Sequence, residues 1–344
     1  MEETRPLLRP LEDAVTAQQP HTAEYEDTLL AFNPQGDTDN PRDWPASYQW
    51  GITALLAFMA FTVTFTCLSV IPVAGHVIAD LSPTHQPSRS ATVLLVTIWE
   101  LGEAAGPLLI APLSELYGRA PVFNCANTLF ILGVALSALS PTTGALISAR
   151  FLTGCAVASN VLNPAVIGDI FPPESRGSAM SAVMLAPLIG GAVGPAIAGA
   201  IAQSAGWRQI MWMSVLLAVI AEFLFLTLFR ETYSGAILRR RATRLQQEKR
   251  GELDEPLESA CERVLSQKPG SQSAVIWQAM QRPAKVFRSS LVLQLLSLYG
   301  AVAFSFFYTM STTLPEMLQT QYGFSPALIG SSFLTFSESP PPPS

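Results

Sequence analysis

The chain has 344 residues, of which 49% are hydrophobic and only 13% are charged, and its formal net charge at pH 7 is −6. A soluble domain carries about 25% charged residues, so this composition excludes an ordinary water-soluble protein and indicates one that lies largely in a bilayer. The sequence holds no phosphate-binding glycine loop, nucleophile elbow or zinc-ligand spacing. We therefore expect no enzyme activity, no cofactor, no metal site and no binding to nucleic acid.

Apolar stretches long enough to cross a bilayer begin after a polar, proline-rich tail at 1–47, which we expect to be disordered and without a signal peptide. The sequence predicts membrane helices at 51–73, 91–113, 121–139, 144–166, 178–201 and 209–229. Together they would form an N-terminal six-helix lobe at 48–229. The polar stretch at 230–289 is expected to be a central loop.

A second block of helices begins after this loop. A seventh helix is predicted at 290–312, and an eighth begins near Phe324 and ends at Phe336. The eighth would reach about 20 Å, short of the roughly 30 Å hydrocarbon core. The end at 337–344 contains four consecutive prolines, which cannot continue a helix. The expected fold is an all-α membrane protein with about seven full spans and a fragment, so that the second lobe at 290–336 is incomplete.

The lysines and arginines predict the orientation. A cytoplasmic N-terminus puts all but three of the 20 on the cytoplasmic side, most of them in the 230–289 loop. The exceptions are Arg89 and Arg208 outside and Arg150 within the fourth helix. A seven-helix receptor would need this basic loop on the outside, so the charge pattern disfavours that alternative.

A short polar turn joins the second and third predicted helices within the segment PLSELYGR, which holds Glu115, Gly118 and Arg119. Glycine permits a tight turn, and the arginine can reach an acid on a neighbouring helix. Asp169 and Arg176, at the end of the fourth helix, are expected to join a charge cluster with it. Such a cluster could act as a conformational switch; alternatively, the arginine only anchors the helix at the cytoplasmic interface.

Four charged residues lie within the predicted spans. A buried arginine is costly in lipid, so Arg150 is expected to face the lobe interior and to pair with Glu100 or Glu103, which share one helix face. Carboxylates at this depth can bind and release protons; the alternative is a permanent structural pair. Glu222, in the middle of the sixth helix, is either another proton site or the partner in an interior hydrogen bond.

The fifth predicted helix contains Gly190, Gly194, Pro195 and Gly199 in the pattern G-x-x-x-G-P-x-x-x-G. Glycines four residues apart let a neighbouring helix approach closely, and proline bends a helix. The pattern suits a gating element, and plain helix packing is the alternative.

Together these segments resemble the major facilitator superfamily, in particular its fungal branch of twelve-helix drug:proton antiporters. The segments PLSELYGR, ARFLTGCA and GGAVGPAIAG are similar to the motifs of its 2–3 turn, helix four and helix five. The segment RETYSGAILRRRATRL is similar to the opening of its central loop. The resemblance covers about residues 40–336 and does not extend to helices nine to twelve.

The resemblance implies a transporter that exports small organic molecules such as drugs, toxins or secondary metabolites, by proton antiport. Its partners would be the lipid bilayer, the substrate and protons. The expected location is the plasma membrane, with a vacuolar or vesicular membrane as the alternative. A rival interpretation is a truncated remnant that does not transport, or a partner of other transporters, because alternating access requires two lobes.

Overall fold

The computed structural model describes residues 32–33, 36–82, 88–248 and 272–335. These residues form helices and no strands. Among these described residues, seven helical segments are long and apolar enough to cross a membrane, which agrees with the number of complete spans expected from the sequence. The protein is therefore an all-α membrane protein.

The first lobe is built from six spans that follow one another with short turns. The first continues through a 3-10 turn, η3 (Ile71–Val73), into the short helix α3 (Ala74–Leu81). The helices of the lobe are α2 (Ala46–Leu68), α4 (Arg89–Tyr117), α5 (Arg119–Leu139), α6 (Thr143–Cys155), α7 (Ser159–Ile170), α8 (Pro173–Ala205) and α9 (Trp207–Leu228).

The fourth span is not the single helix that the sequence predicted. It is divided into α6 and α7, with residues 156–158 between them. Gly154 lies just before this break, and glycine is among the weakest helix formers. The residues after the break form a separate helix, α7, in which Asn160 contacts Glu103 of α4 and Asp169 contacts Arg119 of α5.

The central stretch also differs from a simple loop, because it contains two helices, α10 (Ser234–Glu248) and α12 (Gln272–Ser289). The arginines, leucines and alanines of α10 are good helix formers. The seventh span, α13 (Leu291–Tyr322), is longer than expected and ends at Gly323, whose φ of 68° gives a left-handed helix cap. The short helix α14 (Pro326–Thr335) lies within the predicted fragment.

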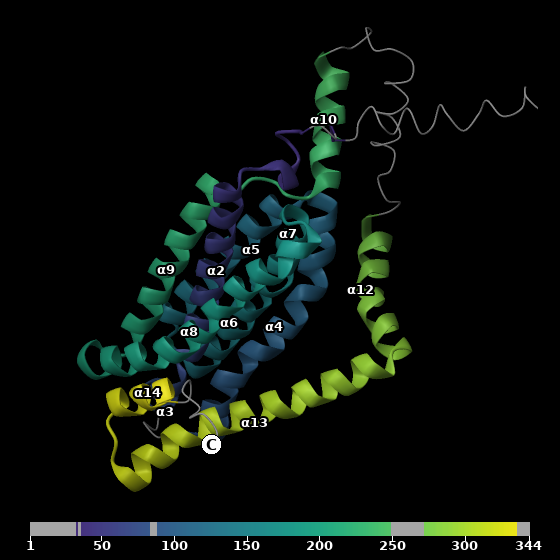
Figure 1. Cartoon of the computed structure of the whole chain (residues 1–344). Coiled ribbons are helices and arrows are strands. Elements are labelled where there is room, and N and C mark those ends of the chain that lie inside the picture. Colours follow the sequence, from purple (N-terminus) through teal and green to yellow (C-terminus); the bar gives the residue numbers. More distant parts are fainter. Residues whose placement is uncertain (1–31, 34–35, 83–87, 249–271, 336–344) are drawn as a thin grey trace, which may run out of the picture.

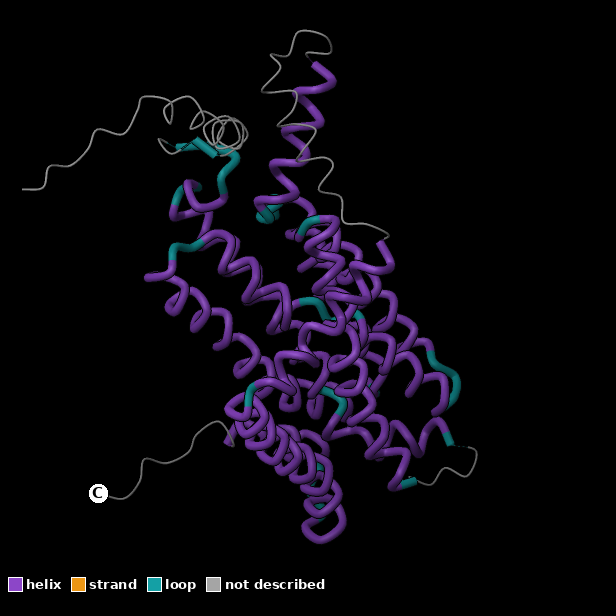
Figure 2. The backbone as a smooth tube through the Cα atoms, turned by 90° about the vertical axis from the view of Figure 1, so that its right-hand side faces the viewer, coloured by secondary structure: helices purple, strands orange, loops and turns teal. Residues whose placement is uncertain are grey.

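The six spans of the first lobe pack side by side, and the later helices lie around this bundle (Figure 1). We call the end that carries residues 36–45, the α4–α5 turn and α10 the tail face. The opposite face holds α3, the α8–α9 turn and α14. Helix α13 runs across the bundle near the opposite face (Figure 1). The view turned by 90° shows that the described residues are helices joined by short loops (Figure 2).

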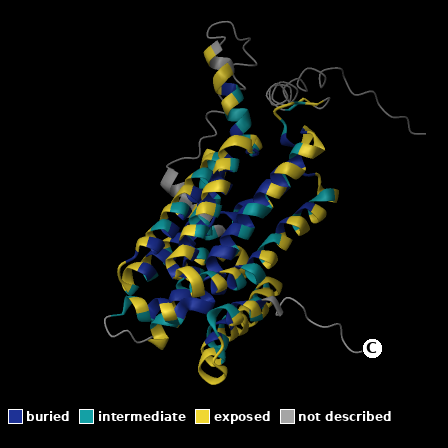
Figure 3. Ribbon diagram, turned by 90° about the vertical axis from the view of Figure 1, so that its left-hand side faces the viewer, coloured by how far each residue is buried: buried dark blue, intermediate teal, exposed yellow. Residues whose placement is uncertain are grey.

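Burial is concentrated in the first lobe (Figure 3). In α2, 72% of the apolar stretch is buried, whereas in α13 none of it is. The core is therefore that of the six-helix lobe, with α2 at its centre, and α13 contributes little to it. Exposed leucines and phenylalanines on the outer helices are expected for surfaces that contact lipid tails.

Candidate functional site

A buried ion pair ties the α4–α5 turn to the fourth span at the tail face. Nε of Arg119, the first residue of α5, lies 3.2 Å from Oδ2 of Asp169 on α7. Nη1 of the same arginine donates to Oγ of Ser114 at 2.6 Å. The two charged side chains are only 10% and 23% exposed, so the pair is partly shielded from water. The structure thus pairs Arg119 with Asp169, two members of the predicted switch motif.

A third charged residue, which the sequence analysis did not single out, completes this group. Oε1 of Glu231, just after α9, accepts the backbone N–H of Arg119 at 2.8 Å and those of Thr232 and Tyr233 at 3.1 and 3.0 Å. Oε2 accepts the N–H of Ala120 at 3.3 Å. The carboxylate therefore caps the positive N-terminal end of α5. We call Arg119, Asp169 and Glu231 the tail-face clasp.

Gly118 is required in this turn for two reasons. Its φ is 100°, in a region that side-chain-bearing residues rarely adopt. A Cβ at this position would also overlap the carboxyl group of Glu231. The signal that could have found Glu231 is its position, as the first acid after the sixth span, separated from the apolar residue Phe229 only by Arg230.

Two residues of the predicted switch motif lie outside this group. Glu115 is exposed near the end of α4 and takes part in none of the ion pairs among the described residues. Arg176 donates instead to the carbonyl groups of Gly168 and Phe171, at 2.8 and 3.0 Å. These carbonyls belong to the last turn of α7 and have no partner within the helix, so the arginine caps that helix.

At the tail face, an arginine of α10 binds the N-terminal segment. Nη1 of Arg241 lies 2.9 Å from Oδ2 of Asp37 in the N-terminal segment. The backbone N–H of Asp39 donates to the same carboxylate at 3.0 Å. That N–H, followed by Arg241, holds the pKa of Asp37 below the ordinary value for an aspartate, and desolvation opposes them. The N-terminal segment is thus fastened to the helix that opens the central stretch.

Arg150 does not form the ion pair that the sequence predicted. It is 1% exposed, and its Nη1 and Nη2 donate to the carbonyl oxygens of Thr66 and Cys67 at 3.0 and 2.9 Å. The described residues contain no ion pair between it and Glu100 or Glu103. The physical reason is that the last carbonyls of α2 have no intrahelical donor and lie at the negative end of the helix dipole. They provide the arginine with acceptors.

Glu100 and Glu103 of α4, which we call the acidic pair, are held by neutral donors. Oε2 of Glu103 accepts the indole N–H of Trp99 at 2.7 Å, and its Oε1 accepts the side-chain amide of Asn160 on α7. Oε1 of Glu100 accepts the hydroxyl of Tyr308 on α13. The last contact joins the first lobe to the second, at a carboxylate within the membrane span.

Glu222 lies between α9 and α5, where it is 6% exposed. Its Oε2 accepts the side-chain amide of Asn127 at 2.7 Å. Its other oxygen and the amide oxygen of Asn127 are buried without a hydrogen-bond partner among the described residues. Glu222 thus forms an interior hydrogen bond to a neutral partner.

The glycines of α8 face two different helices. A Cβ at Gly190 or Gly194 would lie 2.8 or 3.2 Å from the carbonyl oxygens of Phe61 and Phe65 on α2. A Cβ at Gly199 would overlap the carbonyl of Pro326, the first residue of α14. On α14, a Cβ at Gly330 would likewise overlap the carbonyl of Pro195. The predicted motif of helix five therefore lies between the centre of the first lobe and the second lobe.

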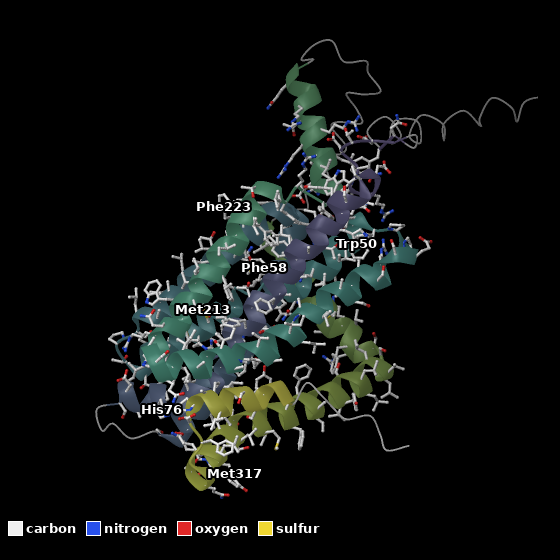
Figure 4. The ribbon with its side chains drawn as sticks, turned by 60° about the vertical axis from the view of Figure 1, so that its left-hand side comes forward. Trp50, Phe58, His76, Met213, Phe223 and Met317 are labelled. Atoms are coloured by element: carbon white, nitrogen blue, oxygen red, sulfur yellow. The ribbon has the colours of Figure 1, made fainter. Side chains whose placement is uncertain are left out.

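Further contacts between the lobes lie at the opposite face, where His76 of α3 and Met317 of α13 are found at the same end of the molecule (Figure 4). Nε2 atoms of His76 and Gln319 lie 3.0 Å apart. Arg89 and Glu316 form an ion pair at 3.6 Å, but both side chains are more than half exposed, so it contributes little. Nearby, a cavity of about 560 Å³ is lined by α3, the α8–α9 turn and Pro326.

Comparison with known proteins now gives the family. The sequence model of the Major Facilitator Superfamily matches residues 50–338. The efflux pump radE of Floropilus chiversii is 33% identical over 318 residues, which are 92% of this chain and 57% of radE. The MFS transporter cpaT of Aspergillus oryzae is 32% identical over 298 residues, 86% of this chain and 58% of cpaT. The chain thus spans less than two thirds of the length of these relatives.

Solved structures share the fold at low sequence identity. A bacterial homologue of the human lysosomal transporter Spinster, in an inward-facing and unoccupied conformation, superposes with a TM-score of 0.60 at 16% identity, over 86% of this chain and 60% of that one. The xylose transporter XylE from E. coli, in a partially occluded inward-open conformation, gives 0.57 at 18% identity, over 85% and 68%. The helices, the motifs and these matches lead to one conclusion: the chain belongs to the Major Facilitator Superfamily, a family of membrane transporters rather than enzymes.

Proposed function

We propose that this chain is part of a membrane exporter that moves small organic molecules in exchange for protons. A relative at 33% identity bears the name efflux pump, and the sequence resembles drug:proton antiporters. The substrates we propose are drugs, toxins or secondary metabolites, whose apolar bodies suit a path between membrane helices. The chain spans 57% of that relative's length, so transport is proposed for a protein that contains both lobes.

The proposed orientation places the tail face in the cytoplasm. Lysines and arginines gather on cytoplasmic segments, and the tail face carries the arginines of α10 at 239, 240, 241 and 244. The opposite face has Arg89 and Arg208. The N-terminus would then be cytoplasmic, and we propose the plasma membrane as the location, because export from the cell requires it.

The acidic pair carries the proposal for proton coupling. Glu100 receives the hydroxyl of Tyr308 across the two lobes. When the lobes separate, this bond breaks and the carboxylate loses a donor. An ionised carboxylate without a partner is costly within a bilayer, so Glu100 would take up a proton from the side that has opened. Closure would return the tyrosine and favour release of the proton.

The tail-face clasp has a different proposed role. Its three members belong to the α4–α5 turn, α7 and the residues after α9, all in the first lobe. The clasp would therefore keep the first lobe rigid while that lobe rocks against the second. The contacts that change during transport would be those that join lobes, at Tyr308, Gln319 and α14.

Transport can be tested in a drug-sensitive host that lacks its own exporters. The chain is expressed alone, and also joined after α14 to the rest of the second lobe of the radE efflux pump. We expect at least the joined form to export a fluorescent drug, and export to stop when an uncoupler collapses the proton gradient. Glu100→Gln and Glu103→Gln should abolish this coupling, whereas Glu115→Gln, at an exposed position, should not. Export that persists without the gradient, or no export by either form, would contradict the proposal.

A further inference from the structure

Trp99 contacts both the buried arginine and one member of the acidic pair. The guanidinium carbon of Arg150 is 4.5 Å from the centroid of the Trp99 ring, which places the cation over the ring. The indole N–H of the same residue donates to Glu103 at 2.7 Å. One side chain therefore contacts both the positive charge and the carboxylate, on different parts of its ring.

The surroundings hold this ring in place. Trp99 is fully buried, and it packs edge to face against Phe130 with their centroids 5.9 Å apart. Glycines make this packing close: a Cβ at Gly154 of α6 would overlap the carbonyl oxygen of Trp99. The close approach of α4 and α6 at this residue fixes the backbone of Trp99, and the burial of its side chain against Phe130 holds the ring.

Arg150 retains the ability to bind a carboxylate. Two of its nitrogens are used by carbonyls of α2, but Nε is buried and has no hydrogen-bond partner among the described residues. A buried guanidinium with a spare donor is a strong partner for a nearby acid. The ring under this cation belongs to the residue whose N–H binds Glu103.

The other groups near Glu103 are neutral or negative. Glu100 lies one turn earlier on α4, and Asn160 of α7 donates to Glu103. Cys67 of α2 and Tyr308 of α13 both donate to Glu100. Among the described residues, Arg150 on α6 is the cation that contacts Trp99, and Trp99 in turn binds Glu103. A carboxylate held by neutral donors can exchange a proton, whereas one paired with arginine is kept ionised.

We propose that Trp99 is a positioning residue for proton binding: its ring keeps Arg150 from pairing with Glu103, and its N–H orients the carboxylate. This inference rests on the proposed function in one respect only, that proton binding at the acidic pair drives export. The proposed effect of Trp99 on proton binding at Glu103 does not depend on transport and can be measured without it.

Two variants of Trp99 separate the two roles. Trp99→Phe keeps an aromatic face over the arginine and removes the N–H that stabilises the carboxylate. Trp99→Leu removes both the N–H and the ring that separates the charges. Proton occupancy of Glu103 is read from its labelling by an apolar carbodiimide, which reacts with protonated carboxyl groups. The purified chain carries Glu100→Gln, so that Glu103 is the labelled member of the acidic pair.

The two variants should shift the pH of half-maximal labelling in opposite directions. We expect Trp99→Phe to raise it by about one pH unit, a tenfold change in proton binding, because a hydrogen bond to the charged form is lost. We expect Trp99→Leu to lower it by about one unit or more, because Arg150 can then pair with Glu103. Trp50→Phe, a matched change at a half-exposed tryptophan of α2, should leave it unchanged.

Shifts in the same direction, or no shift in Trp99→Phe, would overturn the inference. If Trp99→Leu does not fold, the comparison of Trp99→Phe with the parent chain still decides whether the N–H acts on Glu103, and Trp99→Met offers a second variant without an aromatic ring. Failure of the proposed function is seen separately, as normal proton-coupled export by Glu103→Gln. If the pH of half-maximal labelling shifts as expected, the inference is supported whether or not Glu103 is needed for export.

Discussion

Removal of the Glu231 carboxylate tests whether the tail-face clasp stabilises the first lobe. The structure gives this carboxylate four backbone N–H donors, two of which belong to the first residues of α5. Its side chain is only 6% exposed. In Glu231→Ala these donors lose their acceptor, and water can reach the site only in part.

The expected cost follows from three contributions. Loss of an N-cap acceptor costs about 0.5–2 kcal/mol, and loss of a negative charge at a helix N-terminus costs up to about 2 kcal/mol in partly buried sites. The ion pair with Arg240, at 3.8 Å and with an arginine that is 56% exposed, adds less than about 1 kcal/mol. Because the contributions share one carboxylate they are not additive, and we expect Glu231→Ala to lower the free energy of unfolding by about 2–4 kcal/mol.

Denaturant unfolding of the purified chain in mixed micelles measures this change. Glu231→Gln keeps an oxygen acceptor and removes the charge, so its loss should be about half as large. Glu115→Ala is the matched control, since Glu115 is an exposed acid on the same turn, and surface changes of this kind cost less than about 0.5 kcal/mol. A Glu231→Ala variant as stable as Glu115→Ala would refute the assignment of this residue to the clasp.

Three further predictions concern the buried arginine, the glycine contacts and the tail. Arg150→Ala should reduce membrane abundance more than Arg119→Ala, because Arg150 bonds helix carbonyls that water cannot reach; similar abundance of the two variants would count against it. Gly194→Leu should leave insertion intact but lower the free energy of unfolding by about 1–3 kcal/mol, since the added side chain must displace α2; an unchanged free energy of unfolding would show that the contact is loose. Asp37→Asn should weaken the attachment of the N-terminal segment to α10 at pH 7, which limited proteolysis would show as faster cleavage of that segment. Because the pKa of Asp37 is lowered on folding, its contribution is present above the ordinary aspartate pKa of about 3.9 and is lost as the pH falls through the folded value. A difference that persists at the lowest pH would contradict this reasoning.

The sequence by itself determined the membrane helices and the identity of the main charged positions. A span is recognised from its own residues, because the bilayer requires about 20 apolar residues in succession whatever lies beside them. Gly118 could be assigned to a tight turn for the same local reason. The pairing of Arg119 with Asp169 was also expected, since both end up at helix ends on one side of the membrane, and short turns fix that depth.

Only the tertiary structure decided which side chains meet within the lobe. Arg150 reaches carbonyls 83 and 84 residues away in sequence, and this depends on how far α2 and α6 are rotated about their axes. The same holds for the contacts of Glu231 with the first residues of α5 and for the contacts of Trp99 with Arg150 and Glu103. Hydropathy is a sum over neighbouring residues and is unchanged when a helix rotates, whereas a hydrogen bond is lost within about 1 Å of displacement. The spans could therefore be predicted from composition, but the partners of the charges inside them could not.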